Sequence, residues 1–273
     1  MPKIVCLIRH EPPLIYFVNK INQTHGPIVA IVEHPEEEKS LWERIRLKGA
    51  TGTFHAIIQR FKQARIKKEQ HRIYTQYFGE NWKAIEPGIE TLNVNNINLP
   101  EVADFLARIK PDLILDHGTS LVKDHILNQA PLALNLHWGL SPYYRGTFCT
   151  EWALVNWDPY NIGVTIHKLT NIIDGGSILA QRRADIKAAD TAHSINMQLT
   201  YLGTDLACMA IDKIANGKEL EFHKQDLSRG FMTRYSQFSE LLRMQVEFIE
   251  KRGLLKLMLE KPARKHRLPI IEF

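Results

Sequence analysis

Polar side chains suited to acid–base or carbonyl chemistry are concentrated in one short window of the sequence. The window contains Asn135, His137, Ser141, Arg145, His167 and Asp174. Asn135 and His137 stand two positions apart, so on an extended strand both side chains point to the same side. An amide and an imidazole arranged in this way can address a single substrate atom.

Asp174 comes directly before two glycines. Because Gly175 and Gly176 have no Cβ, a tight loop can bring the carboxylate close to another backbone segment or to a ligand. A carboxylate near His137 would orient the imidazole and favour its protonated form. Taken alone, a histidine at a strand end is more often structural, and Asp-Gly-Gly is more often simply a turn. The combination is what favours a catalytic site.

The elements that would position these side chains follow from the hydrophobic pattern. Pro100 can occupy the first turn of a helix with one apolar face, which Pro111 ends. A buried strand is expected at 112–115, a helix at 121–127 and another strand at 132–136. A strand, helix and strand so closely spaced predict a right-handed βαβ unit with parallel strands.

The carboxyl ends of these two strands place polar residues at one edge of the sheet. Residues 116–119 and 135–137 both leave that edge, where open α/β folds bind ligands. A further strand at 162–169 is expected to deliver the loop 170–176 to the same neighbourhood. Residues 190–216 predict a long helix.

The chain as a whole is predicted to be an α/β protein. Apolar runs at 3–9 and 26–32 add two strands. We expect a Rossmann-like, mainly parallel twisted sheet with helices on both faces, plus a small C-terminal extension. The main domain would span residues 1–220, with a helical insertion at about 36–72, and residues 221–273 would form an extension of unknown role.

Composition limits the function classes. The net charge of +5 and the pI near 9.0 suit anionic small molecules such as phosphates and polyglutamylated folate, or a nucleic acid. The basic runs at 60–68 and 261–267 are more typical of solvated helical faces. There is no apolar run of the ~20 residues that span a membrane. The three cysteines are widely spaced and form no CxxC pair, which favours a reducing cytoplasm over a disulfide framework or a thiolate zinc site.

Three segments carry a resemblance to a known family. They are Asn135-Leu136-His137-Trp138-Gly139-Leu140-Ser141-Pro142-Tyr143-Tyr144-Arg145-Gly146, then Gly163-Val164-Thr165-Ile166-His167, then Asp174-Gly175-Gly176-Ser177-Ile178. The sequence resembles the folate-dependent formyltransferases, which carry Asn-x-His, Ser/Leu-Pro-x-x-Arg-Gly, Gly-x-Thr-x-His and Asp-x-Gly-x-Ile in this order. The resemblance extends more loosely over residues 1 to about 216 and is not evident in the C-terminal remainder.

The resemblance implies a mechanism and a co-substrate. Asn135, His137 and Asp174 take the positions of a catalytic triad that transfers a formyl group from 10-formyltetrahydrofolate to an amine. Asn135 and protonated His137 would stabilise the oxyanion, and Asp174 would orient His137 and help to move the amine proton to the departing folate nitrogen. His167 would support the catalytic residues without contacting the substrate. The family's folate pocket maps, without a metal, onto Thr119, Ser120, Leu121, Val122, Thr170, Asn171, Ile172 and Ile173.

The acceptor is predicted partly by exclusion. The branch acting on glycinamide ribonucleotide carries a turn rich in glycine and serine after its first strand, where this chain has Arg9-His10-Glu11-Pro12-Pro13. The branch acting on methionyl-tRNA appends a basic β-barrel, for which the residues after Gly217 leave little room. The loop from Ser141 to Gly146 resembles the enzymes acting on amino sugars attached to nucleotides. We therefore expect a nucleotide-linked amino sugar as the small-molecule partner and neither a nucleic acid nor a membrane, and a homodimer stays open.

A function of another class also stays open. His117, His137, His167 and Asp174 could converge as a nitrogen and oxygen metal site in a hydrolase. No close ligand spacing such as HxxxH supports this alternative.

Overall fold

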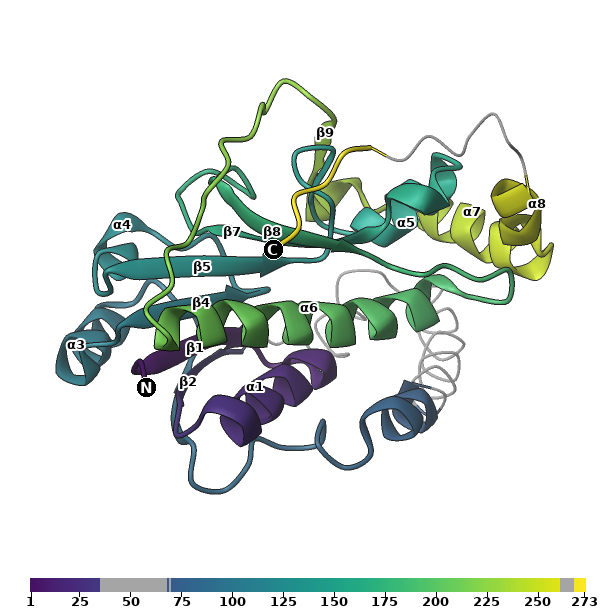
Figure 1. Ribbon diagram of the computed structural model, residues 1–273. Coiled ribbons are helices and arrows are strands. Elements are labelled where there is room, and N and C mark those ends of the chain that lie inside the picture. Colours follow the sequence, from purple (N-terminus) through teal and green to yellow (C-terminus); the bar gives the residue numbers. More distant parts are fainter. Residues whose placement is uncertain (35–67, 69, 261–267) are drawn as a thin grey trace, which may run out of the picture.

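A seven-stranded sheet forms the centre of the molecule (Figure 1). The computed structural model of the chain describes residues 1–34, 68, 70–260 and 268–273. The strand order is β3-β2-β1-β4-β5-β7-β8. The strands are β1 (Ile4–Arg9), β2 (Val29–Glu33), β3 (Glu90–Val94), β4 (Leu113–His117), β5 (Leu132–His137), β7 (Gly163–Lys168) and β8 (Ile178–Arg183). The first five are parallel, whereas β7 runs antiparallel to β5 and β8 antiparallel to β7. The predicted α/β fold with a mainly parallel sheet is confirmed.

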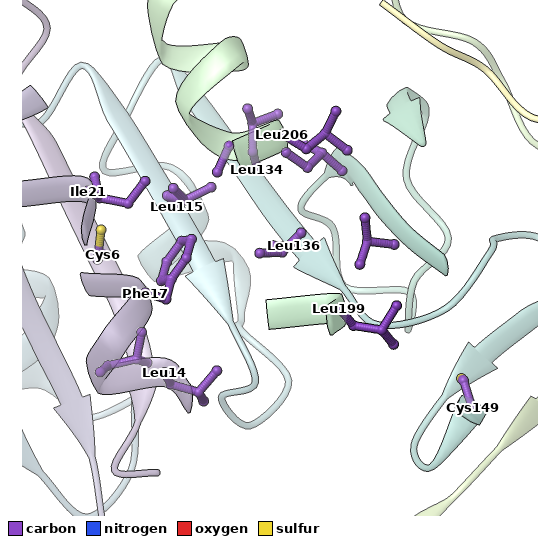
Figure 2. Packing of buried hydrophobic residues seen from close by; sticks show 14 of the residues in the cluster. Cys6, Leu14, Phe17, Ile21, Leu115, Leu134, Leu136, Cys149, Leu199 and Leu206 are labelled. Carbon is purple, nitrogen blue, oxygen red and sulfur yellow. The ribbon is translucent and has the colours of Figure 1, made fainter. Parts of the chain in front are cut away.

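Helices cover both faces of the sheet, as predicted. In Figure 1, α1 (Pro12–His25) and α6 (Ala192–Ala215) lie side by side along one face. Figure 2 shows the core between them and the strands, with Phe17 from α1, Leu115 and Leu134 from the sheet and Leu206 from α6. The other face packs against α3 (Pro100–Ile109) and α4 (Asp124–Leu127). Since both faces are buried, β1 up to Ile8 and the first three residues of β4 are continuous apolar runs rather than alternating ones.

The helix predicted at 121–127 is shorter than expected. Only α4, from Asp124 to Leu127, is helical. The residues before α4 are not helical because the side chain of Asn98 binds their backbone. It accepts a hydrogen bond from the Lys123 N–H (2.8 Å) and donates one to the Leu121 carbonyl (3.0 Å). These hydrogen bonds come from a distant segment, so the local pattern did not contain them. The helices expected at 100–109 and 190–216 are present as α3 and α6.

The path into the loop after β7 also differs from a simple parallel arrangement. Because β7 is antiparallel to β5, Lys168 lies beside Leu134 and not at the carboxyl end of β5. The chain then doubles back along β7, and a Cβ on Gly176 would overlap the carbonyl oxygen of Lys168. A glycine is required for this close approach. The reversal returns Asp174 to the end of β5.

The predicted insertion lies largely outside the described residues. A helix at 70–78 overlaps its predicted end at about residue 72 and packs against the main fold. Phe78 stacks on Tyr16 of α1, with ring centroids 4.5 Å apart, and Tyr201 of α6 meets both rings edge-on.

The described residues beyond 220 pack on the rest of the fold. Strand β9 (Phe231–Thr233) pairs in parallel with β6 (Tyr144–Gly146), and α7 (Glu240–Lys251) packs on α5 (Cys149–Val155). The remaining elements are the short helices η1 (Pro159–Asn161), η2 (Tyr235–Gln237) and α8 (Leu254–Glu260). The domain division at residue 220 stays a prediction. Across the part of the chain described here, we find no helix with the length and apolarity needed to cross a membrane.

Candidate active site

A cavity of about 530 Å³ opens where the order of the strands reverses. The chain builds β2 and β3 on one side of β1 and then continues with β4 and β5 on the other. Open α/β sheets bind ligands beside such a switch point, because the loops on the two sides diverge there. The volume is in the range typical of small-molecule sites. Asn135, His137 and Asp174 all line this cavity.

Asn135 lies at the centre of a buried polar cluster. Its Nδ2 is 3.1 Å from His167 Nε2 and donates to Asp174 Oδ1 at 3.2 Å. His167 Nδ1 faces the carbonyl of Lys168 at 2.8 Å, so Nδ1 carries a proton and Nε2 can accept from Asn135. His167 therefore contacts two members of the predicted triad directly.

His137 is held at both ring nitrogens. Nε2 is 2.9 Å from the carbonyl oxygen of Tyr144 and so carries a proton, whereas Nδ1 is 3.5 Å from Asp174 Oδ2. A Cβ on Gly139 would overlap Nε2, so the glycine permits this position of the ring. The carboxylate of Asp174 can stabilise a proton that arrives on Nδ1.

Asp174 is fixed by backbone groups as well as by side chains. It adopts the left-handed conformation at φ 46°, which is uncommon for a residue other than glycine. Its Oδ2 accepts the Gly146 N–H at 2.6 Å, and its carbonyl accepts from the side chain of Gln225 at 2.8 Å. Both carboxylate oxygens are thus engaged, one by Asn135 and one by Gly146.

Charge in the cluster is distributed unequally. Burial would raise the pKa of Asp174, but the neighbouring His137, the contact with His167 and the Gly146 N–H together lower it to about 2. Burial also lowers the pKa of His137, and this effect exceeds the opposing effect of Asp174. Asp174 thus favours the protonated form of His137, as expected, but burial outweighs it, so the lowered pKa favours the neutral imidazole in the resting site. A neutral His137 has a free electron pair on Nδ1 and can accept a proton.

Seven of the eight residues predicted to bind folate line the cavity. They are Thr119, Ser120, Leu121, Val122, Thr170, Ile172 and Ile173, whereas Asn171 is not among the lining residues. Three of these side chains are apolar and exposed, Leu121 by 50%, Ile172 by 51% and Ile173 by 38%. Exposed apolar groups on facing walls suit a flat heterocycle that would cover them.

Several residues of the site were missed by the sequence analysis. Cys149 Sγ lies 3.7 Å from His137 Nε2, and burial raises the pKa of its thiol. Asp116, which was expected at this edge of the sheet but was given no role there, lines the cavity beside the cluster. The side chain of Glu33, from β2, accepts the Ser120 N–H at 2.7 Å and the Ile97 N–H at 3.0 Å. No local motif marks these residues, because their roles depend on contacts between strands.

Ser141 and Arg145, which the sequence analysis grouped with the candidate catalytic residues, stabilise the fold instead. Ser141 donates its backbone N–H to Thr165, and its carbonyl accepts from the side chain of Gln181. The guanidinium of Arg145 donates to the carbonyl of Leu227. Neither side chain lines the cavity.

The alternative metal site receives little support. His117 lies on the opposite face of β4 from Asp116, and its ring packs edge-on against Phe17 and Trp138. Burial lowers the pKa of His117 to about 3. Within the described ranges, no group of three or more His, Cys, Asp or Glu side chains is arranged to hold a metal ion.

The fold and this cluster define a Rossmann-like α/β protein with a polar small-molecule site at a switch point. Residues 27–211, more than half of the chain, match the family described as formyl transferase. The chain therefore belongs to the formyl transferase family.

Sequence similarity to a known protein covers about half of the chain. The chain is 33% identical over 156 residues to a bifunctional polymyxin resistance protein, ArnA, from Wigglesworthia glossinidia brevipalpis. The match covers 56% of this chain and 24% of that protein, so the chain spans about a quarter of the length of this relative.

Solved structures with the same fold include three N-formyltransferases. A 4-N formyltransferase from Francisella tularensis is 18% identical, with a TM-score of 0.55, over 92% of this chain and 88% of that one. A sugar N-formyltransferase from Shewanella sp. has 16% identity and a TM-score of 0.54, over 89% and 86%. The enzyme from Helicobacter canadensis, solved with folinic acid and dTDP-3-aminofucose, has 18% identity and a TM-score of 0.54, over 88% and 73%. At these identities the likeness concerns the fold alone.

Proposed function

We propose that this protein is an N-formyltransferase that moves a formyl group from 10-formyltetrahydrofolate to a primary amine on a nucleotide-linked amino sugar. The observation that carries the proposal is the buried contact of Asn135, His137 and Asp174 in one cavity of a formyl transferase chain. An amide donor, an imidazole and a carboxylate supply the groups that transfer between two nitrogens requires.

The residues of the cluster divide the reaction between them. Asn135 exchanges its long contact with Asp174 for the formyl oxygen and donates to the charge that develops there. Neutral His137 takes a proton at Nδ1 from the attacking nitrogen and returns it to the folate nitrogen as the carbon–nitrogen bond breaks. Asp174 stays charged and stabilises the imidazolium while His137 carries the proton.

In this proposal, 10-formyltetrahydrofolate binds in the part of the cavity that lies between two loop segments. One wall is formed by residues 119–122 and the other by Thr170, Ile172 and Ile173. The exposed side chains of Leu121, Ile172 and Ile173 offer apolar contact to a pteridine ring. Glu33 holds the backbone of Ser120 and so keeps the first wall in place. The Helicobacter canadensis enzyme, solved with folinic acid, supports a reduced folate as the donor.

The acceptor class rests on the relatives and on the basic charge of the chain. The Helicobacter canadensis relative is described with dTDP-3-aminofucose, and WlaRD, a sugar 3N-formyl transferase, with dTDP. The net charge of +5 would attract a nucleoside diphosphate at long range. Glycinamide ribonucleotide and methionyl-tRNA are the competing acceptors.

The proposal is tested by incubating the purified protein with 10-formyltetrahydrofolate and a panel of amines. We expect tetrahydrofolate release and a product heavier by one formyl group with dTDP-3-aminofucose or a related amino sugar nucleotide. Formylation of glycinamide ribonucleotide or methionyl-tRNA alone would contradict the acceptor. Activity should survive exhaustive chelation, whereas loss on chelation and recovery with zinc would favour the hydrolase alternative.

A further inference from the structure

A second carboxyl group faces the cavity and has no part in the mechanism described above. Asp116 ends β4, and the strand register places it directly beside Asn135 of β5. Paired strands lie roughly 4.8 Å apart, and in this register Asp116, Asn135 and His137 point to the same face of the sheet. Asp116 lines the cavity and is only 5% exposed.

The two carboxylates of the cavity differ in what they can still accept. Asp174 accepts from Asn135 at one oxygen and from Gly146 at the other. Asp116 Oδ1 accepts from the hydroxyl of Thr119 at 2.5 Å, whereas Oδ2 has no hydrogen-bond partner among the residues that the structure describes. The Thr119 contact fixes the orientation of the carboxyl group. Asp116 therefore presents an oriented, unoccupied oxygen beside the reaction centre.

The surroundings of Asp116 also tune its proton affinity. The pKa of Asp116 is raised to about 7, chiefly by burial and also by the charges of Glu33 on β2 and Asp174, against the opposing effects of the Thr119 hydroxyl and Arg9 on β1. The pKa of Asp174, in contrast, is about 2. Where two carboxyl groups in one site are separated in this way, the group near neutrality can exchange protons and the other stays charged.

Formylation of an ammonium ion requires the removal of two protons from its nitrogen, and His137 and Asp174 account for only one of them. A primary amine on a sugar is largely an ammonium ion at neutral pH and has no free electron pair. Two protons must leave its nitrogen before the amide is complete. His137 carries one of them to the folate nitrogen, so another group must take the first.

We propose that Asp116 is the general base that takes the first proton from the ammonium form of the acceptor. The inference rests on the proposed function. Oδ2 of Asp116 accepts this proton, and the electron pair set free forms the bond to the formyl carbon. The second proton leaves through His137 to the folate nitrogen as the old carbon–nitrogen bond breaks. Asp116 then releases its proton to solvent, so each turnover of an ammonium ion yields the amide, tetrahydrofolate and one proton.

The first test compares the wild type with Asp116→Asn, using dTDP-3-aminofucose as the acceptor and pH as the variable. The substitution preserves shape and leaves an oxygen for Thr119, but removes the base. We expect kcat/KM to fall about 10²–10³-fold near pH 7. The deficit should narrow as the pH approaches the pKa of the amine, because solution then supplies the unprotonated form. Asp185→Asn, an exposed position, is the matched control.

The outcomes separate this inference from the proposed function. A wild type that transfers formyl groups, together with a deficit that stays constant across pH, overturns the base role alone. A wild type that formylates no amine overturns the proposed function and the base role with it.

A second measurement needs no substrate. In protein labelled with ¹³C at the aspartate carboxyl carbon, one buried carboxyl should titrate near neutrality, and this signal should be missing from Asp116→Asn. Titration of Asp116 in the ordinary acidic range overturns the inference.

Discussion

The backbone N–H of Gly146 donates a 2.6 Å hydrogen bond to Oδ2 of Asp174. Gly146 has φ +91°, and a Cβ there would overlap the carbonyl oxygen of Thr233. Thr233 belongs to β9, which pairs with β6. The C-terminal part of the chain thus packs against the backbone group that holds the carboxylate of the site.

Replacement of Asp174 by Asn should reduce kcat strongly and change the resting structure little. The amide keeps the shape but cannot carry the charge that stabilises protonated His137, and it places an N–H₂ group against a donor. We expect a loss of about 10²–10⁴ in kcat. Steady-state kinetics at neutral pH checks this result, with Asp185→Asn as a control of the same chemistry on the surface. Turnover within a few-fold of the wild type would remove Asp174 from the proposed mechanism.

Replacement of Gly146 by Ala should impair both stability and activity. The new methyl group combines a strained φ with a clash against the backbone of β9, and overpacking of this kind costs about 1–3 kcal/mol or more. Gly88→Ala is a matched control, because Gly88 has φ +100° and open space around its Cβ position. Urea unfolding should show a larger loss for Gly146→Ala than for Gly88→Ala. Equal losses would mean that the contact with Thr233 is unimportant.

Replacement of Glu33 by Gln should weaken folate binding more than catalysis. The variant loses the charged acceptor for the backbone N–H groups of Ser120 and Ile97, which hold one wall of the cavity. A charge-assisted hydrogen bond of this kind contributes about 1.5–3 kcal/mol. We expect KM for 10-formyltetrahydrofolate to rise at least several-fold, with a smaller change in kcat. An unchanged KM for the donor would place the folate elsewhere.

Replacement of Asp116 by Asn should stabilise the protein at alkaline pH. The pKa of Asp116 is raised from an ordinary value of 3.8 to about 7, so between these values the folded state binds more protons than the unfolded state. Stability therefore falls as pH rises through this window, and the asparagine variant avoids the loss. We expect the variant to gain on the order of 4 kcal/mol at pH 8 and almost nothing near pH 4. Thermal or urea unfolding at both pH values checks the sign, and a destabilised variant at pH 8 would contradict a raised pKa.

Much of the fold could be predicted from the sequence, because its determinants are local. The helix at Pro100–Ile109 has a proline at its start, an apolar face and Pro111 beyond its end, and α6 begins at a capping box between Thr191 and Ser194. The spacing of Asn135 and His137 on one strand likewise required no tertiary information.

The sequence by itself therefore determined the α/β class, the positions of most elements and the window in which Asn135, His137 and Asp174 lie. Only the tertiary structure decided the antiparallel direction of β7, the short α4, the lowered pKa of His137 and the place of Asp116 beside Asn135. These features depend on strand pairing, on hydrogen bonds between distant segments and on burial. The sequence shows the type of each residue but not how deeply it is buried or which charges lie beside it after folding. Burial and neighbouring charges set the pKa of each carboxyl group and so decide which one holds a proton.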